Sequence, residues 1–119
     1  MNPFMIMKPL GETYYVTITN TISSLPTIPD GAERCLVQVE TQNVRVKFNA
    51  TSSVTYCATA GAGGGICLFV NTVATPYYII EGKDNMSRAR FYRDTSSDGF
   101  INVVFQGEVQ TTAYNGGKA

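Results

Sequence analysis

Polar and apolar residues alternate along most of this chain, which is the pattern of β-strands. In residues 34–40 every second side chain is a cysteine or a valine, and residues 44–48 set two valines and a phenylalanine against an arginine and a lysine. Helical spacing of apolar residues is not sustained anywhere over ten residues. The alternation therefore predicts strands over residues 13–19, 34–40, 44–48, 54–57, 66–70, 77–81, 88–93 and 100–106.

Turn signals separate these runs. Pro29, Asp30 and Gly31 reverse the chain, because proline presets φ and glycine accepts a positive φ. Residues 41–43 are few enough to join the flanking strands as a hairpin, and residues 94–99 are a plain turn between the last two strands. The order of these signals predicts a single all-β domain, an antiparallel β-sandwich or a barrel of about eight short strands.

The apolar faces of these strands define the expected core. We expect the sandwich to span residues 13–109, after an N-terminal arm over residues 1–12 and before a flexible polar tail over residues 110–119. The expected core residues are Val16, Ile18, Cys35, Val37, Val39, Val44, Val46, Phe48, Phe91, Ile101, Val103 and Phe105.

Length and charge narrow the class of protein. The chain has 119 residues and a mass of 12.9 kDa, enough for one domain with its own core. Charged residues make up only 15% of it, so we expect partners to cover part of its surface. Nine basic and nine acidic residues cancel, which gives no long-range attraction to nucleic acid, and no apolar run is long enough to cross a membrane. The first residues make a poor secretory signal, so we expect synthesis in the cytoplasm.

Candidate chemistry is sparse. The chain contains no histidine, which removes the commonest general base and the usual partner of a serine or cysteine nucleophile. The glycine-rich residues 61–67 lack the glycine and lysine positions of dinucleotide- and phosphate-binding loops. Cys57 and Cys67 flank this segment and fit buried thiols, a disulfide or half of a metal site. We therefore expect neither an enzyme nor a bound cofactor.

Two groups of residues are candidates for contacts with other chains. The apolar start of the chain either frays or packs on a neighbouring subunit. A set of cations on outward faces either stays solvated or meets an acidic protein surface, and we expect no nucleic acid there. The residues are Phe4, Met5, Ile6 and Met7 in the first group and Arg45, Lys47, Arg88 and Arg90 in the second.

A carbohydrate-binding module is an alternative from a different class. Such modules present aromatic rings to sugars. The chain has no tryptophan, so the pairs Tyr14-Tyr15 and Tyr77-Tyr78 are the candidates to supply one aromatic face each.

Three pieces of the chain resemble small β-sandwich virion proteins of tailed bacteriophages, which serve as capsid cement or decoration proteins. The pieces are PDGA at residues 29–32 followed by LVQVE at 36–40 and VR at 44–45, then residues 86–92 with their Arg90-Phe91, and finally INVVF at 101–105. The resemblance runs over residues 14–107. It breaks at residues 57–67, where a longer glycine-rich segment replaces a short turn.

The resemblance implies a jelly-roll-like sandwich, with an immunoglobulin-like one as the second choice, that assembles as a trimer on the phage head. It implies the major capsid protein as a partner and a mechanical function, in which the homo-oligomer bridges adjacent capsomers and stabilises the shell. The protein would be made in the host cytoplasm and located at the capsid surface of the virion. A neck, tail or fibre component of the virion is the alternative within this class.

Overall fold

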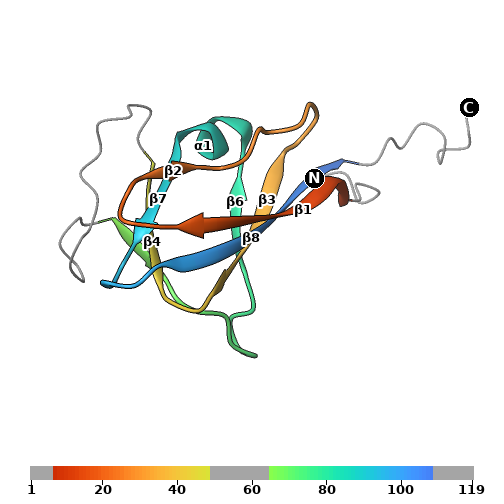
Figure 1. Ribbon diagram of the computed structural model, residues 1–119. Coiled ribbons are helices and arrows are strands. Elements are labelled where there is room, and N and C mark those ends of the chain that lie inside the picture. The colour runs from red at the N-terminus through yellow and green to blue at the C-terminus, as the bar shows by residue number, and fades with distance from the viewer. Residues whose placement is uncertain (1–6, 49–64, 109–119) are drawn as a thin grey trace, which may run out of the picture.

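The computed structural model describes residues 7–48 and 65–108, which form two antiparallel sheets of four strands each (Figure 1). Helix α1 (Lys83–Arg88) lies at one end of the sandwich, at the top of Figure 1. Sheet A has the order β1 (Met7–Ile18), β8 (Gly99–Glu108), β3 (Arg34–Glu40) and β6 (Tyr78–Glu81), and sheet B the order β2 (Ser23–Ser24), β7 (Ala89–Arg93), β4 (Val44–Phe48) and β5 (Ile66–Leu68). The prediction of an all-β antiparallel sandwich is confirmed.

Strand pairing makes this sandwich a jelly roll. β1 pairs with β8, β2 with β7, β3 with β6 and β4 with β5, all antiparallel. This is the pairing of one long hairpin folded at its middle. Wrapping that hairpin into two sheets adds the β3–β8 and β4–β7 pairs and gives the double-sheet arrangement of eight-stranded jelly rolls. The first choice of fold, jelly-roll-like rather than immunoglobulin-like, therefore agrees with the topology.

The connection over residues 41–43 does not make a hairpin, and this prediction was wrong. β3 belongs to sheet A and β4 to sheet B, so the chain crosses between the sheets here. A three-residue hairpin would pair Glu40 with Val44 and put the β3 valines on the same face as Arg45. Crossing to the facing sheet lets the valines of both strands enter one core. Thr41 helps to redirect the chain with a φ of 75°.

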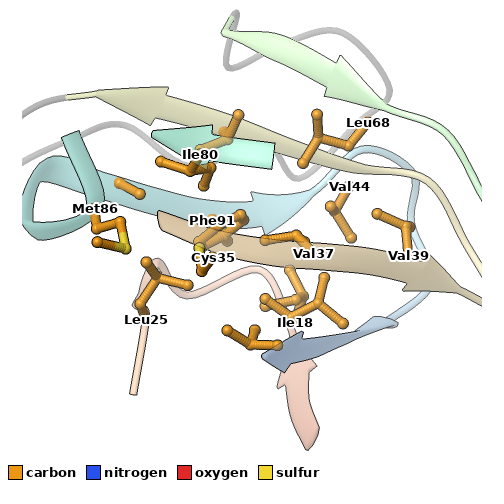
Figure 2. Packing of buried hydrophobic residues seen from close by; sticks show 14 of the residues in the cluster. Ile18, Leu25, Cys35, Val37, Val39, Val44, Leu68, Ile80, Met86 and Phe91 are labelled. Atoms are coloured by element: carbon orange, nitrogen blue, oxygen red, sulfur yellow. The ribbon is translucent and has the colours of Figure 1, made fainter. Parts of the chain in front are cut away.

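One cluster of buried apolar side chains fills the space between the sheets (Figure 2). Burial alternates strictly along β3 and along β8 as far as Gly107. Met86 of α1 and Leu25 after β2 also join this cluster, as Figure 2 shows. Burying each large side chain contributes roughly 1.5–3 kcal/mol. The expected core residues that are buried are Ile18, Cys35, Val37, Val39, Val44, Val46, Phe91, Ile101, Val103 and Phe105.

Two expected core residues differ from the prediction. Val16 is half-buried and packs against the cluster from β1. Phe48 is 42% exposed, although it alternates in step with the buried Val46. It is the last residue of β4, and its ring lines an open hollow of about 420 Å³ with Ile79 and Asn85 at the margin of the sandwich. Alternation shows which side of a sheet a residue takes, but not whether the facing sheet reaches it.

Strand β1 begins earlier than the sequence predicts. Residues 7–12, assigned to the arm, are strand residues, and Met7 lies opposite Glu108 of β8. Leu10 pairs with Phe105 and Tyr14 with Val103, so β1 advances four residues over a stretch in which β8 advances two. Because four is an even number, Leu10 and Tyr14 still lie on the same side of β1, and both pack against the core. The candidate contacts Phe4, Met5 and Ile6, the expected strand over residues 54–57 and the expected tail lie outside the described residues.

Helix α1 was not predicted, and the strand expected over residues 88–93 begins one residue later, at Ala89. The helix has six residues and one buried side chain, Met86, which is too little periodicity to detect in the sequence. Arg88 therefore lies on the helix and not on the strand. No helix in the described part of the chain is long and apolar enough to cross a membrane.

Candidate functional site

Side chains that point away from the core form a broad surface on sheet A. Because strands alternate, residues between the buried ones face the solvent. The register places Leu36 between Val104 and Ile79, and Gln38 beside Asn102. This outer face of sheet A comprises Thr13, Tyr15, Leu36, Gln38, Glu40, Tyr77, Ile79, Phe100, Asn102 and Val104.

Aromatic rings lie toward both edges of this face. Tyr15 of β1 stacks on Phe100 of β8 with ring centroids 5.1 Å apart and an interplanar angle of 14°. Tyr15 remains 60% exposed, and Tyr77, next to β6, is 47% exposed. Their chain neighbours Tyr14 and Tyr78 instead pack against the core cluster. Each tyrosine pair thus supplies one exposed ring to the outer face of sheet A.

Amide side chains occupy the middle of the face. Asn102 Nδ2 donates to Glu40 Oε2 at 2.7 Å and to Gln38 Oε1 at 3.3 Å. Gln38 Nε2 donates to the Pro76 carbonyl at 3.4 Å. Both bonds of Gln38 are longer than usual, and no hydrogen bond among the described residues uses Asn102 Oδ1. These amides therefore retain capacity to bind a ligand.

An open hollow of about 430 Å³ lies between these groups. Its volume is within the range of roughly 300–1,000 Å³ for small-molecule sites. It combines apolar surface, one aromatic ring, two amides and the hydroxyl groups of a threonine and a tyrosine. The lining residues are Thr13, Leu36, Gln38, Tyr77, Asn102 and Val104.

The outer face of sheet B contains a largely buried ion pair. Arg45 Nε lies 2.5 Å from Asp94 Oδ1, and the two side chains are 20% and 12% exposed. The hydrogen bond to Asp94 raises the pKa of Arg45, and Arg45 Nη1 also donates to the Gly65 carbonyl at 3.1 Å. Arg45, predicted to contact another chain, is thus engaged within its own chain, where it connects β4 to the turn after β7.

The other predicted cations separate into two places. Lys47 and Arg90 lie opposite each other on β4 and β7, on the same outer face as Arg45. Arg88 lies apart on α1, where its Nε is 3.0 Å from Asp84 Oδ2. The structure therefore brings together three of the four cations that the sequence singled out.

A second apolar surface lies at β5 and on the segment that follows it. Ile66 is 59% exposed, Phe69 58% and Val73 fully exposed. β5 is an edge strand of sheet B, and the segment between β5 and β6 projects at the bottom of Figure 1. We call these three residues the β5 surface. Sequence reasoning missed it because alternation in so short a strand does not show that the strand lies at an edge.

The described cysteines are not activated thiols. Cys35 is fully buried, and burial raises its pKa to about 12. Burial also raises the pKa of Cys67, to which the negative charge of Asp94 adds. Both are free thiols, and Cys57 lies outside the described residues. Within residues 7–48 and 65–108 no group of three or more histidine, cysteine or acidic side chains gathers to hold a metal ion.

Comparison with known proteins adds no assignment, because no protein-family model, no curated protein and no solved structure matches the chain. The molecule offers two exposed surfaces for binding, the outer face of sheet A and the β5 surface. The first combines aromatic, apolar and amide groups and the second is apolar, so both suit the binding of a ligand or a partner. Sequence reasoning named both tyrosine pairs as candidate aromatic faces but missed the role of Asn102, since its contact with Gln38 depends on the pairing of two distant strands.

Proposed function

We propose that this chain is a structural protein of a phage virion, a trimer that decorates the head, binds the major capsid protein and bridges neighbouring capsomers. It acts mechanically at the capsid surface and catalyses no reaction. The observation that carries the proposal is the β5 surface, where Ile66, Phe69 and Val73 expose apolar side chains on a small domain. Three exposed apolar side chains within residues 66–73 favour burial of this segment against another protein.

Fold and composition support this proposal. Double-sheet jelly rolls are common in viral coats, although a fold alone does not assign a function. Charged residues make up only 15% of the chain, which suits a surface covered by protein neighbours.

We assign the β5 surface to the contact between copies of the chain. β5 lies at the edge of sheet B, so a second copy reaches its apolar side chains without opening a sheet. Lys47 and Arg90, on adjacent strands of the same sheet, are assigned to an acidic patch of the capsid shell. Weak contacts of each copy then add up, because the oligomer attaches at several points.

Quantitative mass spectrometry of purified particles tests the virion placement. Particles of the phage that encodes this chain should contain it in a copy number comparable to that of the major capsid protein. A few copies per particle would place it in the neck, tail or fibre instead. Absence from washed particles would overturn the proposal.

Light scattering of variants tests the assigned contact. The wild-type chain should have the mass of a trimer at micromolar concentration, with and without reductant. The double variant Phe69→Ser/Val73→Ser changes only exposed side chains, so it should fold normally but shift to monomer. Tyr15→Ser is the matched control, because it removes an exposed ring from the other sheet. Equal masses for all three proteins would rule out the β5 surface as the contact.

A further inference from the structure

We infer that the hollow on the outer face of sheet A binds a neutral saccharide. The residues that line the hollow include none of the proposed assembly contacts, which are Ile66, Phe69, Val73, Lys47 and Arg90. The inference therefore stands whether or not the protein decorates a virion. It depends on the ring of Tyr77, the amides of Gln38 and Asn102, and the absence of charge among the six lining residues.

The aromatic ring suits the apolar face of a sugar. A pyranose presents C–H groups on its ring faces and hydroxyls around its rim, so it packs flat against an aromatic side chain while its rim stays polar. Tyr77 is 47% exposed and lines the hollow beside the apolar Leu36 and Val104. Tyr15 lies opposite Asn102 in the β1–β8 register, so its exposed ring extends the surface on the far side of the amides.

The amides suit the hydroxyl rim. A sugar hydroxyl both donates and accepts a hydrogen bond, and a carboxamide matches it with an NH₂ group and a carbonyl oxygen. Asn102 Oδ1 accepts no hydrogen bond from the described residues, and the contacts of Gln38 at 3.3 and 3.4 Å are long enough to be exchanged for a ligand. Glu40, fixed by Asn102 at 2.7 Å, adds a carboxylate acceptor next to this pair.

Charge and polarity disfavour other ligand classes. No lysine or arginine lines the hollow, and the nearby Glu40 carboxylate repels anions, so phosphate groups and nucleic acid are poor ligands. A purely apolar ligand would leave the Gln38 and Asn102 amides desolvated without partners. A neutral saccharide satisfies both the apolar and the polar part of the lining.

Nuclear magnetic resonance titration tests the inference on the full chain. The ¹⁵N-labelled protein is titrated separately with neutral oligomers of glucose in α and β linkage, of mannose, and of N-acetylglucosamine. At least one probe should give saturable shifts of the Gln38 and Asn102 side-chain NH₂ signals, unchanged when sodium chloride is raised, because the probes carry no charge. If none of the four probes shifts these signals at millimolar concentration, the inference is wrong.

Variants connect any binding to this hollow. Tyr77→Ala and Asn102→Ala should each weaken the responding probe by about tenfold or more, which is about 1.4 kcal/mol, whereas Tyr77→Phe keeps the ring and should bind nearly as well as the wild type. Phe69→Ser, on the β5 surface, should bind like the wild type. Backbone spectra of each variant report whether the fold is kept. Unchanged affinity in folded Tyr77→Ala and Asn102→Ala variants would overturn the assignment.

Discussion

Replacing Arg45 by glutamine should destabilise the domain, because the Asp94 carboxylate then loses the guanidinium that donates to it while it stays largely out of water. The two side chains are 20% and 12% exposed. Exposed ion pairs contribute roughly 0–1 kcal/mol, whereas removing one partner of a buried pair costs roughly 3–5 kcal/mol. The exposure of this pair lies between the two cases, so we expect the free energy of unfolding to fall by about 2 kcal/mol.

A double-mutant cycle in urea, followed by circular dichroism, measures this effect. Arg45→Gln and Asp94→Asn should each lose about 2 kcal/mol, and the double variant should lose about as much as either one, because each single variant already breaks the same ion pair. Lys47→Gln is the matched control. Lys47 lies two residues further along β4 on the same face and has no ion pair with a described residue, so its loss should stay within about 0.5 kcal/mol.

Two outcomes would refute this reasoning. If Arg45→Gln and Lys47→Gln unfold at the same urea concentration, the ion pair does not hold sheet B together. If the losses of the single variants add in the double variant, Arg45 and Asp94 act independently despite their contact. Either result would make Arg45 a candidate contact with another chain, as the sequence pattern indicates.

Two further predictions use the same unfolding assay. A β-carbon at Gly107 would lie 2.5 Å from the Gly31 carbonyl oxygen, so Gly107→Ala should lower the free energy of unfolding by roughly 1–3 kcal/mol. Unchanged stability would contradict this prediction and would mean that the turn at Gly31 moves away without cost. Burial raises the pKa of Cys35 from 9.0 to about 12, so above pH 9.0 the unfolded chain releases a proton that the folded chain keeps. Stability is unaffected by this thiol at lower pH and should fall by up to about 1.4 kcal/mol per pH unit between the two values. Cys35→Ala should remove this part of the pH dependence, and identical slopes for both proteins would contradict it.

Alternation in the sequence was sufficient to predict the fold class and most of the core, because it depends only on neighbouring residues. Every second residue of β3 from Cys35 to Val39 is buried, as the pattern indicated. The hairpin over residues 41–43 was wrong because a short connection is compatible with crossing between sheets. Helix α1 was missed because six residues contain too little periodicity. Phe48 was misplaced because exposure at a strand end depends on how far the facing sheet extends.

The candidate site was only partly visible in the sequence for the same reason. The outward direction of Tyr15 and Tyr77 follows from the inward direction of their neighbours, a local property. The contact between Gln38 and Asn102 instead requires β8 to lie between β1 and β3, which no short stretch of sequence specifies. The hollow depends on that pairing, since its lining comes from β1, β3, β8 and the residue before β6.

The position of β8 in the middle of sheet A determines when the protein can fold during synthesis. β1 and β3 leave the ribosome before β8. Until residues 99–108 have been made, β1 has no strand partner within sheet A, and β3 can pair only with β6. Ile101, Val103 and Phe105 are also fully buried, so the core is open on one side until then. A nascent chain that stops before Gly99 exposes two strand edges and an uncovered apolar layer. Premature termination therefore yields an aggregation-prone fragment rather than a smaller domain.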